Sequence, residues 1–98
     1  MAVLNKNVGL VEKDISAENT FSDGLYVEGD FSFSISGTFV GTVTVQRSFD
    51  AGATWRDVDT FTAPIETAGY DGEPIVVYRA GIKTGDYTSG TASVRIGR

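Results

Sequence analysis

The sequence is 98 residues long, has a formal charge of −5, and contains neither cysteine nor histidine. A chain of this length forms one domain, and without cysteine it has no disulfide and no thiolate metal site. The acidic balance disfavours nucleic acid and anionic membrane surfaces as partners, and the lack of histidine removes the commonest general base and transition-metal ligand.

The N-terminal part has the least regular pattern. Short strands are predicted at Val8–Val11 and Leu25–Val27, with a loop at Asp14–Asp23 that ends in an Asp23-Gly24 turn. We therefore expect one domain over residues 1–98 with a less regular N-terminal arm over about residues 1–23. The start of the chain lacks a basic region followed by a long apolar run, so no secretory signal is expected. No apolar stretch approaches the roughly 20 residues of a membrane-spanning helix.

The middle of the chain alternates with a period of two, which is the period of a β-strand. In the segment Phe31–Ser36 the apolar residues fall on one face and three serines on the other, and Val43 and Val45 continue the alternation. Gly41 predicts a bulge or a turn. A strand is predicted from Trp55 to Phe61, with a bulge or a half-exposed face because its apolar residues share no parity. Ala63-Pro64 ends it.

The last third predicts two further strands and two turns. Ile65–Tyr70 is a weaker strand candidate, Tyr70–Pro74 is a turn cluster, and Thr84–Gly90 is a loop. Ile75–Ile82 is a central strand because both of its faces carry apolar residues. Its predicted inward residues are Val76, Tyr78, Ala80 and Ile82, and those of the final strand are Ala92, Val94 and Ile96. The pattern predicts an all-β fold, a single antiparallel β-sandwich of about seven to eight strands, either immunoglobulin-like or jelly-roll-like.

The segment Ser48–Trp55 matches the pattern S-x-D-x-G-x-T-W, known as the Asp-box, at each defined position: Ser48, Asp50, Gly52, Thr54 and Trp55. The Asp50 carboxylate is expected to accept backbone N–H groups across the bend, and Gly52 to adopt a positive φ. The motif occurs in sialidases and in unrelated β folds, where it stabilises a hairpin and usually lies far from the active site. We interpret it as structural. A sugar-binding role would require the Trp55 indole to be exposed.

The remaining polar residues give weaker signals. Asp57 and Asp59 share strand parity, so their carboxylates are expected to lie close together, on a solvated face rather than in a glycosidase site. Asp71 and Glu73 lie in a predicted turn, but their spacing does not resemble a calcium loop. Tyr70 and Tyr87 lie near turns and form a candidate binding surface, with partly buried loop anchors as the alternative. No nucleotide-binding motif is present. We expect no catalytic residue, no cofactor and no metal.

Two segments, Gly41–Pro64 and Tyr78–Arg95, together resemble small virion proteins of tailed bacteriophages. The likeness spans roughly Gly37–Gly97 and does not include the residues before Phe31. The Tyr-Arg and Ser-Gly-Thr-x-x-Val-Arg elements of the second segment are similar to the last hairpin of an immunoglobulin-like sandwich. The resemblance implies a capsid decoration or cement protein, or a tail or fibre module.

The leading expectation is a capsid decoration protein that binds the major capsid protein and stabilises the head, made in the host bacterial cytoplasm and carried in the virion. Such a role implies a homo-oligomer, for which a trimer is expected, and other virion proteins as partners. The alternative is a carbohydrate- or receptor-binding module of a tail or fibre, with Trp55 and Tyr87 as an aromatic platform. A small glycoside-active enzyme is a third possibility, disfavoured because one sandwich of this size encloses a catalytic pocket only with long loops.

Overall fold

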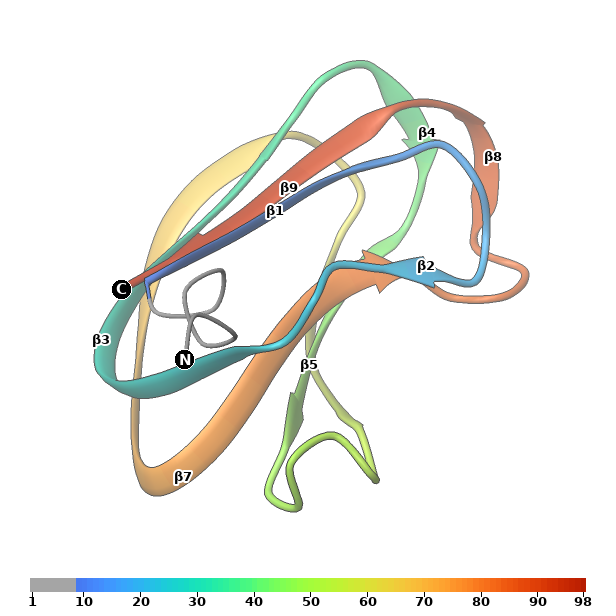
Figure 1. The fold of residues 1–98 in the computed structure, drawn as a ribbon. Coiled ribbons are helices and arrows are strands. Elements are labelled where there is room, and N and C mark those ends of the chain that lie inside the picture. The colour runs from blue at the N-terminus through green and yellow to red at the C-terminus, as the bar shows by residue number, and fades with distance from the viewer. Residues whose placement is uncertain (1–8) are drawn as a thin grey trace.

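The computed structural model describes residues 9–98, which form nine β-strands and no helix. The fold is an all-β, sandwich-like arrangement of two antiparallel sheets, as the alternation predicted, with nine strands in place of the expected seven to eight (Figure 1). The strands are β1 (Leu10–Ile15), β2 (Thr20–Phe21), β3 (Leu25–Ser36), β4 (Phe39–Gly41), β5 (Val43–Ser48), β6 (Arg56–Phe61), β7 (Ile65–Ile82), β8 (Tyr87–Gly90) and β9 (Ala92–Gly97).

The main sheet has seven strands in the order β1-β9-β3-β7-β5-β6, with β2 also paired to β7, while β4 and β8 form a small separate sheet. The long strands β3 and β7 belong to both layers of the sandwich. The second half of β3 pairs with Ile65–Asp71 of β7 and with β9, whereas Leu25–Val27 pair with Val76–Tyr78. Figure 1 shows both strands curving round at one end of the molecule, where the sheet folds over on itself.

The bend follows from a local break in the β3–β7 ladder. Val27 pairs with Val76 and Gly29 pairs with Asp71, so residues 72–75 form an excursion opposite a single residue of β3. Gly29 has a φ of 94°, in the left-handed region that glycine adopts without strain. The predicted turn at Tyr70–Pro74 is therefore wrong as a chain reversal, because β3 pairs with β7 on both sides of the excursion and keeps it one strand.

The core confirms the predicted inward faces. Phe33 is 4% exposed and Ile35 is 2% exposed, while the serines between and beside them face outward or are partly covered. Both layers contribute aliphatic side chains to one cluster, which the packing of strand faces accounts for. Its buried members include Val11, Ile15, Leu25, Val27, Phe33, Ile35, Val43, Val45, Val76, Tyr78, Ala80, Ile82, Ala92, Val94 and Ile96.

The expected N-terminal arm is corrected within the described residues. β1 pairs along its whole length with β9, and Val11 and Ile15 are buried in the core. This strand is longer than the predicted Val8–Val11 and includes part of the predicted loop, because β9 offers it a complete ladder partner. The predicted strand at Leu25–Val27 is the beginning of the continuous β3. Residues 1–8 of the expected arm lie outside the described residues.

Four other local predictions have clear outcomes. The predicted loop at Thr84–Gly90 contains β8, which pairs with β4, and Gly41 lies at a register shift between these two strands. A register shift also occurs in β6, which is exposed along most of its length, as its mixed parity predicted. Strand β7 is central, as predicted, but Ile75 at the start of its predicted segment is 65% exposed, because it belongs to the excursion.

Candidate interaction surfaces

The Asp-box forms the hairpin between β5 and β6. The fully buried Ser48 Oγ donates to Asp50 Oδ1 at 2.6 Å and accepts the Gly52 N–H at 2.8 Å. Asp50 Oδ1 also accepts the Thr54 N–H at 2.8 Å, and Gly52 has a φ of 97°. The bond from Ser48, together with those from Thr54, lowers the pKa of Asp50 to about 2. Each of these polar groups is therefore used to hold the turn.

Trp55, the last residue of the motif, packs against a cation from another strand. The Arg79 guanidinium lies 4.2 Å from the Trp55 ring and 4.0 Å from the Phe21 ring, so it is enclosed between two aromatic faces. Arg79 Nε donates to Gln46 Oε1 at 2.9 Å. Burial alone accounts for the lowered pKa of Arg79. This stack joins β2, β5, β7 and the Asp-box hairpin.

The stack is one end of an apolar stripe on the outer face of one layer. Val77 lies two residues before Arg79 on the same outward parity of β7, and its partner across the ladder is Tyr26. A side chain at Gly24 would contact both Val77 and Trp55, so these two groups meet over the glycine. Tyr26 is 45% exposed. Ile75 lies two residues before Val77 on β7 and so shares its parity. We call this set the aromatic stripe, and its members are Phe21, Tyr26, Trp55, Ile75, Val77 and Arg79.

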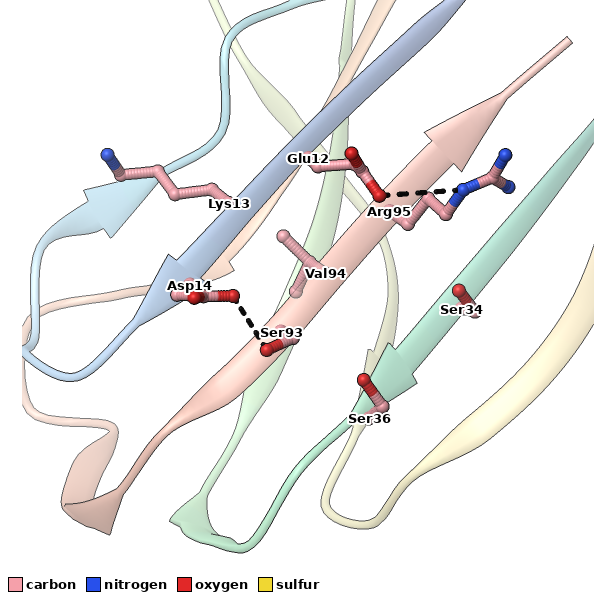
Figure 2. A pocket seen from close by; sticks show the side chains of 8 residues that line it. All are labelled: Glu12, Lys13, Asp14, Ser34, Ser36, Ser93, Val94 and Arg95. Atoms are coloured by element: carbon pink, nitrogen blue, oxygen red, sulfur yellow. Dashed lines mark hydrogen bonds and ion pairs between the residues drawn. The ribbon is translucent and has the colours of Figure 1, made fainter.

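The outer face of the other layer is polar. It has a shallow hollow of about 390 Å³ over β1, β9 and β3 (Figure 2). Ser93 Oγ donates to Asp14 Oδ1 at 2.7 Å, and Arg95 Nε lies 3.7 Å from Glu12 Oε2. Figure 2 shows the hydroxyls of Ser34 and Ser36 beside this pair of contacts. The two outer faces therefore differ: one carries serine hydroxyls and charged side chains, and the other carries aromatic side chains.

The predicted juxtaposition of Asp57 and Asp59 is wrong. The register shift in β6 places Asp59 opposite Val45 and Asp57 opposite Gln46, and these two β5 residues face opposite sides of the sheet. Asp57 accepts Gln46 Nε2 at 2.9 Å and Lys83 Nζ at 2.8 Å, and these bonds, that from Lys83 first, lower its pKa. A carboxylate pair on one face does not form, because the bulge inverts the alternation between them.

Asp71 has a structural role that sequence reasoning missed. It is 5% exposed and accepts the Tyr78 hydroxyl at 2.7 Å, Arg47 Nη1 at 2.9 Å and the Glu73 N–H at 3.0 Å. Because Asp71 is engaged by three donors, the start of the β7 excursion is organised around an internal ion pair. The available signal was a charged residue, Arg47, on the inward parity of Val43 and Val45, but its partner is set by the β7 excursion.

Tyr70 and Tyr87, the candidate binding surface, lie on different strands, and Trp55 and Tyr87 do not form the aromatic platform expected for a sugar-binding module. Tyr70 is 73% exposed on β7 and lies opposite Asp30, whereas Tyr87 begins β8 opposite Gly41 and donates its hydroxyl to Gly90 O at 3.0 Å. The Asp-box hairpin that carries Trp55 and strand β8 lie at opposite ends of the molecule in Figure 1. The indole is also partly covered by Arg79, so Trp55 and Tyr87 do not offer one surface to a sugar ring.

Within residues 9–98, no group of three or more metal-ligating side chains is placed to hold an ion. The same residues contain no helix that is long and apolar enough to cross a membrane. No protein-family model, no curated protein and no solved structure matches the chain.

Proposed function

We propose that this chain is a non-catalytic structural protein of a tailed-bacteriophage particle, a decoration protein that binds the major capsid protein through the aromatic stripe and stabilises the head. The proposal takes its protein class from the resemblance of Gly41–Pro64 and Tyr78–Arg95 to small virion proteins. It includes self-association, as a trimer, on the head surface.

The aromatic stripe is the observation that supports this proposal best. It combines Tyr, Trp and Arg, the residue types that contribute most energy at protein–protein interfaces. Ile75 is 65% exposed and Tyr26 is 45% exposed, while the Arg79 guanidinium is held rigidly between two rings. Side chains fixed before binding lose little conformational entropy on docking. Val77 is buried, and the exposed apolar side chains of the stripe are those of Tyr26 and Ile75. Large exposed apolar side chains of this kind are typical of a surface that a partner covers.

The polar groups of the kinds that serve in catalysis already have internal partners. Ser48 and Asp50 hold the hairpin turn, Asp71 bonds Tyr78 and Arg47, and Asp57 bonds Lys83. Their geometry is therefore that of a scaffold, which supports a role in contact rather than in chemistry.

The proposal is tested with heads of the phage that encodes this chain, assembled without it. The purified chain is expected to bind these heads and to raise the temperature at which they lose their contents. Ile75→Glu places a charge in the stripe and should weaken binding at least about tenfold, because that is the effect of losing roughly 1.4 kcal/mol at an interface. Val40→Glu is the matched control, since Val40 is a 57% exposed aliphatic residue on β4, outside the stripe.

Two results would count against the proposal. If the unaltered chain does not bind the heads, the decoration role is wrong. If Ile75→Glu and Val40→Glu bind as well as the unaltered chain, the stripe is not the contact surface.

A further inference from the structure

A seam on one side of the sandwich is bordered by two strand edges that have no ladder partner among the described residues. In residues 9–98, β6 pairs only with β5, and the Ile65–Asp71 half of β7 pairs only with β3. These two segments follow each other in the chain through residues 62–64 but lie in different layers. An apolar hollow of about 190 Å³ opens between them, lined in part by Phe31, Phe33, Val58, Asp59, Phe61 and Thr67.

We propose that this seam binds an extended segment of a partner protein, which adds to β6 as a strand, inserts one apolar side chain into the hollow and sets a basic side chain against Asp59. The proposal concerns a surface separate from the aromatic stripe and does not depend on the virion role.

The backbone of β6 is available for such pairing. Five of its six residues are exposed. The Thr60 N–H donates to the neighbouring Asp59 Oδ1 at 2.8 Å, so an added strand exchanges this local contact for a ladder bond and releases Asp59 for a basic side chain. A strand edge presents a row of backbone donors and acceptors, which an extended chain satisfies better than a helix or a loop does. The free edge therefore specifies the conformation of the occupant.

The hollow specifies one of its side chains. Phe31 and Phe33 of β3 and Phe61 of β6 contribute rings to it, and the Phe33 and Phe61 ring centroids are 5.5 Å apart. Its volume equals that of about six water molecules, which is enough for one large aliphatic side chain. Because successive residues of a strand face opposite sides, one apolar residue enters the hollow while its neighbours stay at the rim.

Charge specifies the rest of the occupant. Asp59 lines the hollow from β6, while Asp57 on the same strand is already paired with Lys83. The chain as a whole carries a formal charge of −5. A segment that carries a basic residue two positions from its apolar residue presents both side chains to the hollow side, so it complements the seam, whereas one with an acidic residue at that position is repelled.

The test uses the full chain and two capped seven-residue peptides built otherwise of threonine, one with a valine and a lysine two positions apart and one with a valine and a glutamate two positions apart. Binding is followed by isothermal titration calorimetry. The lysine peptide is expected to bind at least about tenfold more tightly than the glutamate peptide. Asp59→Asn should reduce that preference several-fold. Thr60→Pro removes the N–H that the added strand would bond and should lower affinity at least about tenfold.

A second test modifies the peptide and leaves the protein unaltered, in case Thr60→Pro affects folding. The lysine peptide with N-methyl groups on alternate residues loses the backbone donors of one edge, and it should not bind. Equal binding of both unmethylated peptides, or unimpaired binding of the N-methylated peptide, would overturn the proposal. So would a dimer of the chain that Thr60→Pro dissociates, because the occupant would then be a second copy.

Discussion

Asp71 is the residue on which most internal polar contacts converge. Burial raises its pKa, but the hydrogen bonds from Tyr78, the Glu73 N–H and Arg47 outweigh burial and hold the pKa below its ordinary value of 3.8. The ionised form is thus favoured by folding. Through linkage, this stabilisation is fully present above the unfolded pKa and is lost as the pH falls through the lowered folded value.

Asp71→Asn is expected to cost about 1–3 kcal/mol at neutral pH, because Arg47 and the Tyr78 hydroxyl lose a charged acceptor. The difference from the unaltered chain should narrow when urea unfolding is measured in acid, well below the ordinary value of 3.8, because the stabilisation from the ionised Asp71 is lost as the pH falls through the lowered pKa of the folded state. Asp30→Asn is the control, since Asp30 is exposed on the adjacent strand β3 and should change stability by less than about 0.5 kcal/mol. An equal difference at both pH values would contradict this account.

Phe33→Ala tests the inward face of β3. Phe33 is 4% exposed and packs with Phe61, so its truncation should reduce the free energy of unfolding by about 3–5 kcal/mol. A loss of this size is a large fraction of what a small domain possesses. Urea denaturation monitored by circular dichroism measures it, and a loss below about 1 kcal/mol would show that the ring makes little contribution to the core.

Residues whose contacts are local could be predicted from the sequence, and residues with distant partners could not. The Asp-box bonds join positions at most four apart, so the motif alone implied them. Arg79 meets Phe21 and Trp55 only because β2 and the β5–β6 hairpin are brought to β7. No periodicity within a strand contains that information, and the aromatic stripe was consequently missed.

At the scale of elements, β2 depends on a glycine. A Cβ on Gly81 would lie 2.2 Å from Thr20 O and 2.5 Å from Phe21 Cα, both of them backbone atoms of β2. Gly81→Ala is therefore expected to displace β2, to separate Phe21 from Arg79 and to cost about 1–3 kcal/mol through overpacking. Faster amide hydrogen exchange at Thr20 and Phe21, together with a lower melting temperature, would report the displacement.

Gly97→Ala is the control for this substitution. A Cβ at Gly97 meets nothing closer than the flexible end of Arg95 at 3.4 Å. Gly97→Ala should therefore change the melting temperature and the exchange rates much less than Gly81→Ala does. If the two variants had the same amide hydrogen exchange rates at Thr20 and Phe21 and the same melting temperature, β2 would not be held by close packing on β7.

Strand positions followed from the sequence wherever apolar and polar residues alternate, as in β3 and β9. The pattern failed where tertiary pairing overrides a local turn signal. Tyr70–Pro74 contains glycine and proline, yet β3 pairs with β7 on both sides of it and prevents a reversal. The bulge in β6 was expected, but its consequence for Asp57 and Asp59 was not, because a shift of one residue exchanges the two faces of a strand.

Across the whole molecule, the sheet is continuous from one layer to the other. β3 and β7 each contribute one half to each layer, so the two layers are linked by unbroken backbone as well as by the core. The all-β class followed from the period of two. The strand order could not be predicted from the sequence, because it depends on which strand edges meet after the sheet bends at Gly29.

The antiparallel pairing of β1 with β9 brings the two ends of the described chain together, with the Arg98 N–H donating to Gly9 O at 2.9 Å. A short linker from residue 98 to residue 9 would thus close the backbone into a ring without stretching either strand. New ends opened at the exposed residues 62–64 would give a circular permutant with the same set of neighbouring strands. A protein fused after residue 98 would likewise extend from the end of the sheet where β1 begins.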